Sequence, residues 1–318
     1  MQKNKKYDIV GIGNAIVDLI AEVDDSYLEK NSINKGSMSL VDYDVVNRIG
    51  NEVDIVKTIS GGSVANSIVC IAQQNLKTVF IGKVNQDELG EKFAKGLAEE
   101  NVEFKITKSL ANKHTARCII LVSPDAERTM NTYLGVSQEL TEEDVDLNII
   151  EESSILYLEG YLWDLDNAKK AIKKSISTAI NSETKIAFSI SDAFCVDRFR
   201  EEFIDLVNNS ADIIFANESE IKSLFETNEL NDAIKKCQDT KKIFAVTLGD
   251  KGAKIIYKNE VVDIKAEVIN KLVDTTGAGD LFAAGFLAEY LKTQDLELSG
   301  KQGVKMASII IQQFGARI

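Results

Sequence analysis

The hydrophobic and polar residues of the chain follow two different patterns. In the second half, short apolar runs alternate with stretches whose apolar residues recur every three or four positions, which predicts strands that alternate with helices. Strands and helices in this order form a mostly parallel sheet covered by helices on both faces, so we expect an α/β fold. The predicted strands are residues 155–161, 185–191, 212–216, 243–248, 253–257 and 261–265, and the predicted helices are 167–181, 197–208, 277–291 and 300–314, with two more beginning at 218 and 231.

The first half of the chain contains a second kind of segment. Strands at 7–13 and 78–84 and helices at 64–74 and 88–100 fit the same alternation. Two groups of predicted strands, at about residues 15–41 and 102–134, do not alternate with helices. We expect these groups to pair as a small sheet that acts as a lid over a site at the strand ends. The chain is then a single domain of residues 1–318 with lid segments inserted in the α/β core.

Composition changes this picture mainly by exclusion. The net charge of −13 argues against nucleic acid or an anionic membrane as the main partner, and no apolar run is long enough to cross a bilayer. The four cysteines are scattered and the chain has one histidine, which argues against a cysteine metal cluster, disulfides and a histidine-based nucleophile. Since the sequence begins without a secretory segment, we expect a cytoplasmic protein.

The most informative segment is Asp-Thr-Thr-Gly-Ala-Gly-Asp at residues 274–280, directly before a predicted helix. The first backbone N–H groups of a helix have no intrahelical partner, and Gly277 and Gly279 let an anion approach them closely. Asp280 adds a carboxylate beside this anion-binding backbone. Transfer of a phosphoryl group to a hydroxyl requires such a site next to a base. The simpler alternative is a tight turn in which Asp280 only caps the helix.

Two common nucleotide-binding patterns are absent from the sequence. Gly11 and Gly13 follow the first predicted strand, but the third glycine of a dinucleotide-binding motif is replaced by Ile16, and the segment leads into a strand. A dehydrogenase is therefore disfavoured. The chain also has no Walker A pattern, so that ATP would have to bind without a P-loop.

Two segments carry groups that suit sugar hydroxyls. Asp18 lies four residues after Asn14, and its carboxylate can accept two hydrogen bonds from a vicinal diol. Gly62 precedes a predicted helix that carries Asn66 in its first turn, so that backbone and side-chain amides can bind hydroxyls there. The alternatives are a solvated turn at the first pair and a glycine-rich helix entry capped by Ser63 at the second.

Further candidates suit phosphate and metal. Asn217 follows a predicted strand at its carboxyl end, and Glu220 lies three residues later on the same side. Such an oxygen pair suits Mg²⁺ held through water, although an acidic helix start is a common alternative. Arg128 lies in a predicted strand, where it can steady a transferring phosphoryl group or simply be exposed.

Together these motifs resemble those of the ribokinase-like (PfkB) family of sugar and nucleoside kinases, over almost the whole chain. Residues 274–280 match the most specific motif of that family, and Gly62 with Asn66, Asn217 with Glu220, and 246–249 with Gly252 match the others. The resemblance implies a three-layer α/β/α fold with a small β-sheet lid. It also implies transfer of the γ-phosphate of ATP to a primary hydroxyl, with Mg²⁺ as cofactor.

The resemblance implies a role for each matching residue. Asp280 would be the general base for the acceptor hydroxyl. The backbone anion hole would be formed by Gly277, Ala278 and Gly279. The sugar hydroxyls would be held by Asn14, Asp18, Gly62 and Asn66. Mg²⁺ would be organised by Asn217 and Glu220, and the groups around ATP and its phosphates would be Arg128, Asn217, Thr247, Gly249, Gly252, Thr275, Ala307 and Ile311.

Residues 13–18 and 127–132 resemble the adenosine kinases of this family, bacterial ones in particular. This favours the 5′-hydroxyl of adenosine as acceptor, giving AMP in purine salvage. The residues expected to contact the adenine base are Ile16, Met130, Leu162 and Phe194. Animal adenosine kinases tend to carry an aromatic ring where this chain has Leu162. A kinase for ribose, fructose or another nucleoside, and a non-catalytic nucleoside-binding protein, are the alternatives.

The resemblance leaves three properties open. Some relatives bind a monovalent cation near the residue that corresponds to Asp274. A monomer and a homodimer both agree with the sequence, because lid strands can pair within one chain or across two. The chain ends soon after Gly315, Ala316 and Arg317, so we expect it to lack part of the family's C-terminal segment.

Overall fold

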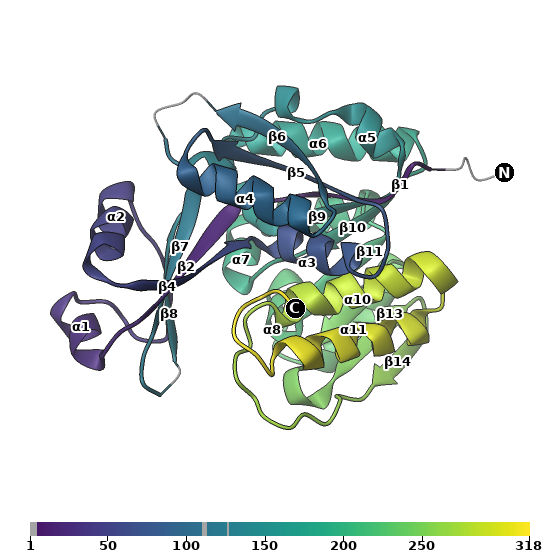
Figure 1. The fold of residues 1–318 in the computed structure, drawn as a ribbon. Coiled ribbons are helices and arrows are strands. Elements are labelled where there is room, and N and C mark those ends of the chain that lie inside the picture. Colours follow the sequence, from purple (N-terminus) through teal and green to yellow (C-terminus); the bar gives the residue numbers. More distant parts are fainter. Residues whose placement is uncertain (1–4, 110–112, 126) are drawn as a thin grey trace.

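The computed structural model describes residues 5–109, 113–125 and 127–318 (Figure 1). Their large sheet has nine strands in the order β14-β13-β12-β11-β10-β9-β1-β5-β6. Neighbouring strands from β12 to β6 are parallel, and only β13 and β14 pair antiparallel at one edge. The strands are β1 (Tyr7–Ile12), β5 (Thr78–Asn85), β6 (Glu103–Ser109), β9 (Ser153–Glu159), β10 (Lys185–Ser189), β11 (Ile213–Asn217), β12 (Ile243–Thr247), β13 (Ala253–Tyr257) and β14 (Glu260–Ile264).

Helices cover both faces of this sheet, and each face has its own hydrophobic core. In β9, Leu156 and Leu158 belong to one core, whereas Ile155 and Tyr157 belong to the other, because successive side chains of a strand point to opposite faces. The first core is formed with α5 (Leu147–Glu151), α6 (Asp166–Asn181), α7 (Ala193–Asn209), α8 (Glu218–Leu224) and α9 (Leu230–Thr240). The second is formed with α3 (Ser63–Ala72), α4 (Glu88–Glu99), α10 (Ala278–Thr293) and α11 (Leu296–Ile310).

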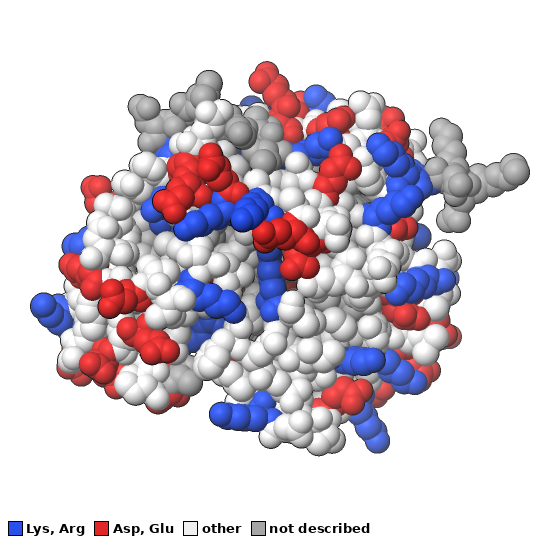
Figure 2. All heavy atoms as spheres, in the orientation of Figure 1, with Lys and Arg blue, Asp and Glu red and all other residues white. Residues whose placement is uncertain are grey.

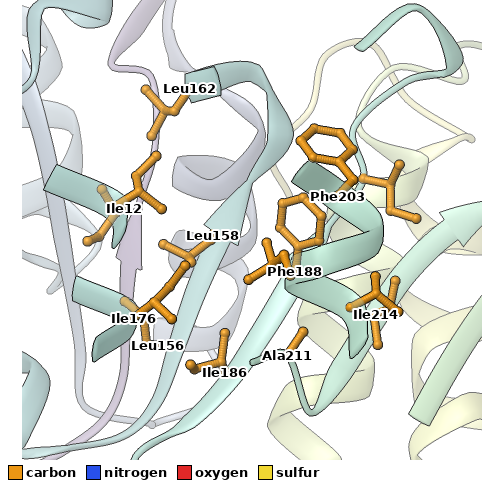
Figure 3. Close-up of a cluster of buried hydrophobic side chains, with 14 of the residues drawn as sticks. Ile12, Leu156, Leu158, Leu162, Ile176, Ile186, Phe188, Phe203, Ala211 and Ile214 are labelled. Atoms are coloured by element: carbon orange, nitrogen blue, oxygen red, sulfur yellow. The ribbon is translucent and has the colours of Figure 1, made fainter. Parts of the chain in front are cut away.

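Figure 3 shows part of the first core. The rings of Phe188 on β10 and Phe203 on α7 meet edge to face, with centroids 5.1 Å apart. Burying one such side chain contributes about 1.5–3 kcal/mol, so this contact helps to fix α7 on the sheet. The expected three-layer α/β/α architecture is confirmed.

The second sheet has five strands in the order β3-β8-β7-β2-β4 and lies beside the main domain (Figure 1). Along β7, Ile119 and Leu121 pack against two small helices on the outer face, whereas Cys118 and Ile120 point to the opposite face. The strands are β2 (Ile16–Glu22), β3 (Met38–Leu40), β4 (Ile55–Gly61), β7 (Ala116–Val122) and β8 (Arg128–Tyr133), and the outer helices are α1 (Asp25–Lys30) and α2 (Tyr43–Glu52). The small sheet corresponds to the expected lid.

The structure corrects the boundaries of the predicted lid. The first strand of the predicted lid group at residues 102–134 is β6, and it pairs with β5 in the large sheet instead of joining the lid. The reason is that β5, α4 and β6 form a parallel β-α-β unit. The lid also contains α1, α2 and β4, which the hydrophobic pattern did not predict. β4 is an edge strand in which only the last two residues are buried, and such strands carry a weak hydrophobic pattern. Two helices begin earlier than expected, α7 at Ala193 and α11 at Leu296.

The surface agrees with the charge composition. On the face shown in Figure 2, acidic and basic side chains are interspersed and no large basic patch is present. Among the helices of residues 5–109, 113–125 and 127–318, none is long and apolar enough to cross a membrane.

Candidate active site

One pocket lies between the lid and the carboxyl ends of the parallel strands, with a volume of about 340 Å³. The loop before α10 and the start of α3 form the wall between these two sides. From the lid, the pocket is lined by Ile16, Asp18, Cys118, Ile120, Met130 and Thr132. The central wall consists of Gly62, Ser63, Asn66, Thr276, Gly277, Gly279 and Asp280. At the strand ends, the lining residues are Ser189, Phe215, Ala216, Asn217, Ala245 and Thr247, with Glu220 beside them. The fold thus brings together residues that lie more than 200 positions apart in the sequence.

Asp280 is in the first turn of α10 and is held by two side chains of α3. The Ser63 hydroxyl donates to Oδ1 at 2.6 Å, and the Asn66 amide donates to Oδ2 at 3.0 Å. Burial raises the pKa of Asp280 to about 6, and the hydrogen bonds from Ser63 and Asn66 oppose this rise because they favour the charged form. The carboxylate is therefore ionised near neutral pH, at the pocket wall.

The backbone before Asp280 forms a tight turn in which one amide of the predicted anion hole is already bonded. Gly277 has a left-handed φ of 76°, and a Cβ there would lie 2.7 Å from the Cβ of Ala316. The amide of Ala278 donates to the carbonyl of Thr275 at 3.2 Å, so the protein itself already occupies this group of the expected anion hole. Within the described residues, the amides of Gly277 and Gly279 have no protein partner, and a Cβ on Gly279 would meet nothing within 4 Å. The amides of Gly277 and Gly279 are therefore the open groups of the expected anion hole.

Asp18 lines the lid side of the pocket, as its sequence position suggested. Burial raises its pKa to about 7, while the charges of Arg128 and Arg317 oppose this rise. The carboxylate packs against Gly61, where a Cβ would lie 2.5 Å from Oδ2. A half-protonated carboxylate at neutral pH gains hydrogen bonds when a ligand hydroxyl donates to it.

Asn14 does not line the pocket but is buried behind it. Its backbone N–H and its side-chain Nδ2 donate to Oε1 of Glu159 at 2.9 and 2.8 Å. The same carboxylate accepts from the backbone N–H of Val64, at the start of α3, at 3.0 Å. Asn14 therefore helps to hold the helix that carries Ser63 and Asn66.

Sequence reasoning missed Glu159, although a signal was present. It is a charged residue that ends an otherwise apolar strand, at the edge where ligands bind in open parallel sheets. Its side chain is fully buried, and burial raises its pKa to about 7 against the hydrogen bonds from Asn14 and Val64. Gly13 leaves room for it, since a Cβ there would lie 2.7 Å from Oε2.

Asn217 and Glu220 form a reciprocal cap at the start of α8. Oδ1 of Asn217 accepts from the N–H of Glu220 at 2.9 Å, and both oxygens of Glu220 accept from Asn217, from Nδ2 at 2.6 Å and from the backbone N–H at 2.9 Å. Burial raises the pKa of Glu220 to about 7. In residues 5–109, 113–125 and 127–318, no cluster of three or more acidic, histidine or cysteine side chains could hold a metal. The pair fits Mg²⁺ only through water or phosphate.

Arg128 extends from lid strand β8 to the loop before α10. It pairs with the carboxylate of Asp274, and its Nη1 donates to the Thr276 hydroxyl at 3.0 Å. The side chains of Arg128 and Asp274 are only 9% and 3% exposed. Asp274 also accepts from the backbone N–H groups of Thr276 and Gly315, both at 3.0 Å. All of its described partners are donors and one is a cation, so this carboxylate does not fit direct binding of a monovalent cation.

The lid side of the pocket is largely apolar. Ile16, Ile120 and Met130 come from three neighbouring lid strands, and Tyr161 lies in the segment after β9. Tyr161 is held by its hydroxyl, which donates to the carbonyl of Ser191 at 3.2 Å. This wall can accommodate a planar apolar group.

Two residues that were expected to contact the nucleobase do not reach the pocket. Leu162 is 2% exposed and belongs to the core beneath the sheet, because the short 3₁₀ helix after β9 turns Tyr161 to the pocket instead. Phe194 is 62% exposed, and its ring stacks on Arg198. The structure thus brings together Ile16 and Met130 but not Leu162 or Phe194.

Of the residues expected around ATP, some line the pocket and others do not. Thr247 and Asn217 end neighbouring strands β12 and β11 and line the pocket. The others lie outside its lining. Gly249 and Gly252 shape the turn after β12, where their φ angles are 62° and 90°. Ile311 holds the segment before the 274–280 loop, because its carbonyl accepts from the N–H of Val273 at 2.8 Å. The residues outside the pocket lining are Arg128, Gly249, Gly252, Thr275, Ala307 and Ile311.

The chain is similar to known kinases in both sequence and structure. The profile of the pfkB family carbohydrate kinases matches residues 8–318, so the chain belongs to this family. A structure titled adenosine kinase from Sinorhizobium meliloti is 41% identical, with a TM-score of 0.90, and the match covers 98% of this chain and 96% of that one. A structure titled "probable sugar kinase protein" from Rhizobium etli is 38% identical, with a TM-score of 0.91, covering 98% and 95%. Adenosine kinase of Saccharomyces cerevisiae is 26% identical over 332 residues, covering 96% and 95%.

The class of the protein follows from these findings. It is a phosphotransferase that acts on an alcohol group, a sugar or nucleoside kinase of the PfkB family. Relatives named for sugars and relatives named for adenosine are similar to a comparable degree.

Proposed function

We propose that the protein transfers the γ-phosphate of ATP to the 5′-hydroxyl of adenosine, with Asp280 as general base. One observation carries this proposal: Asp280 lines the pocket next to Gly279, whose backbone amide has no partner among the described residues. A hydroxyl placed there has a proton acceptor on one side and an anion-binding backbone on the other. The lid side then holds the acceptor, and the ends of β11 and β12 hold ATP.

Each residue has a distinct task in this mechanism. Asp280 takes the proton of the acceptor hydroxyl as the hydroxyl oxygen attacks the γ-phosphorus, and the bond from that phosphorus to the bridging oxygen breaks to release ADP. Gly279 donates to the negative charge that develops at the start of α10. Asp18 accepts hydrogen bonds from the ribose hydroxyls. When bound with ATP, Mg²⁺ would neutralise phosphate charge near Asn217 and Glu220. This charge compensation matters because the pocket lining contains carboxylates but no lysine or arginine.

The apolar lid wall supports a nucleoside over a free sugar. Ile16, Ile120, Met130 and Tyr161 offer a surface suited to the faces of a planar base, whereas every carbon of a free hexose carries a polar group. The second candidate is a sugar kinase, supported by the 38% identical structure titled as one and by the polar side chains of Asp18 and Thr132 at the same wall. A non-catalytic nucleoside-binding protein is the third.

A substrate panel separates these functions. ADP release is measured with ATP, Mg²⁺ and adenosine, inosine, ribose or fructose, alone and in competition. We expect the highest kcat/KM for adenosine, with AMP as the product. A higher kcat/KM for ribose or fructose would replace the first candidate with the second, and binding of adenosine without ADP release would support the third.

The pKa values of two carboxylates predict the pH dependence of kcat/KM. Asp280 must be ionised to take a proton, and Asp18 must be ionised to accept two hydrogen bonds. Since their pKa values are about 6 and about 7, kcat/KM should fall as the pH drops through this range, about tenfold per pH unit for each group. The Asp18→Asn variant should keep only the limb near pH 6. A flat profile between pH 5 and 8 would contradict both roles.

Gly277 and Gly279 give a matched pair of substitutions. In Gly277→Ala, the new Cβ meets Ala316 in a left-handed backbone conformation, which we expect to cost about 1–3 kcal/mol of unfolding free energy. Because the loop must shift, turnover should also fall by about 10²–10³. Gly279→Ala has free space for its Cβ and should keep the unfolding free energy of the wild type. Urea unfolding and steady-state kinetics of both variants measure the difference; equal stability would argue against the strained turn.

A further inference from the structure

Arg317 lies in the last described turn of the chain and reaches the back of the active site. Its Nε donates to Oδ1 of Asn66 at 3.2 Å, and the Nδ2 of that same amide donates to Oδ2 of Asp280 at 3.0 Å. A chain of hydrogen bonds therefore runs from Arg317 through Asn66 to the proposed base. Asn66 is only 5% exposed, so water does not replace these partners easily.

The direction of this chain follows from the chemistry of the amide. An asparagine side chain has one oxygen that accepts and one nitrogen that donates. If the amide of Asn66 turned over, its NH₂ would face the guanidinium of Arg317 and its oxygen would face the carboxylate of Asp280. Both contacts would be repulsive. Arg317 thus selects the one orientation in which Asn66 donates to Asp280.

The hydrogen bond that Arg317 makes through its side chain goes to an amide rather than to a carboxylate. Its buried Nη2 has no protein partner among the residues that the structure describes, and the charges of Asp18 and Glu100 act on its guanidinium without a hydrogen bond between them. Burial lowers the pKa of Arg317 to about 10, so the group is still charged at neutral pH. A buried charge without a hydrogen-bonded counter-ion is costly, and its main contact is the amide that holds Asp280.

We propose that Arg317 is a positioning residue for phosphoryl transfer, which fixes the amide of Asn66 so that it holds and orients the carboxylate of Asp280. This inference rests on the proposed function, since it gives Asp280 the role of base. Arg317 acts through Asn66 and contacts neither the acceptor nor the reacting phosphoryl group. Its removal frees the Asn66 amide to rotate, and Asp280 then loses one of its two side-chain donors.

The first test is Arg317→Met, which keeps the length of the side chain but removes its donors. We expect kcat to fall about tenfold to hundredfold, less than loss of the base itself, with the KM for ATP unchanged. Because the Arg317 charge also acts on Asp18, the pH–rate profile is measured in the Asp18→Asn background, where the acidic limb should move to higher pH since Asp280 keeps fewer donors to its charged form. Guanidinium added at non-denaturing concentration should restore part of the lost kcat.

Gln313→Met is the matched control. Gln313 donates to the backbone carbonyl of Arg317 at 2.9 Å, so it anchors the same turn without contacting Asn66 or lining the pocket. It should keep the kcat and the pH profile of the wild type. If Arg317→Met lowered only the melting temperature, with kcat and the pH profile unchanged, the positioning role would be wrong.

A double-mutant cycle with Asn66 tests the route of the effect. If Arg317 acts through Asn66, adding Arg317→Met to Asn66→Ala should change kcat by less than about twofold. Independent, multiplicative losses would overturn the proposal. The charged and titratable groups that also face Asp280 are Asp18 from β2, Tyr157 and Glu159 from β9, and Tyr161 after it; none of them is altered in this cycle.

The outcomes distinguish this inference from the proposed function. If Asp280→Asn abolishes turnover while Arg317→Met behaves like Gln313→Met, only the role of Arg317 fails. If Asp280→Asn keeps its turnover, the proposed base itself is wrong.

Discussion

Replacing Asp280 with Asn should lower kcat by about 10²–10⁴, with little change in the affinity for the acceptor. The amide has nearly the shape of the carboxylate and can still accept from the Ser63 hydroxyl, but it cannot take a proton from the acceptor. Rapid-quench measurement of a single turnover, together with equilibrium binding of adenosine, separates the chemical step from binding.

Glu289→Gln provides the control for this prediction. It makes the same change from acid to amide on the same helix, α10, but Glu289 is outside the pocket lining. It should keep the wild-type kcat. Near-wild-type turnover in Asp280→Asn would remove Asp280 from the role of base and would leave helix capping as its explanation.

Replacing Arg128 with Ala should lower the free energy of unfolding by about 3–5 kcal/mol, because it leaves the buried carboxylate of Asp274 without its cation. The side chain links lid strand β8 to the loop before α10, so the loss should also loosen the lid over the pocket. Hydrogen exchange should therefore increase in β8 and in residues 274–280, and the KM values for both substrates should rise. Urea unfolding gives the size of the effect.

The double variant Arg128→Ala with Asp274→Asn tests this physical cause. If the penalty comes from an uncompensated buried charge, neutralising Asp274 should restore a large part of the lost stability. Lys35→Ala is a suitable control, because this lid residue makes ion pairs with two exposed carboxylates, for which an effect of at most about 1 kcal/mol is expected. Additive losses in the double variant would show that Arg128 stabilises the fold by packing alone.

The tertiary structure changed the expected contacts of the nucleobase more than those of the reacting groups. Asp280 and Asn217 reach the pocket because motif residues at the ends of parallel strands and the starts of helices meet at one edge of the sheet, and Asp18 reaches it from lid strand β2. Leu162 and its neighbour Tyr161 differ by one position, and only the 3₁₀ turn after β9 decides which of them faces the pocket. A pattern of apolar residues cannot resolve such a turn.

The sequence by itself determined the alternating strands and helices of the α/β core, since these depend on the local spacing of apolar residues, and the glycine-rich loop with Asp280, since it is a contiguous segment. Only the tertiary structure placed β6 in the large sheet and brought Glu159, Arg128 and Arg317 to the back of the site. These residues act through partners from 95 to 251 positions away. Local patterns carry no information on such pairs, because the packing of the whole chain decides which buried charges and amides meet.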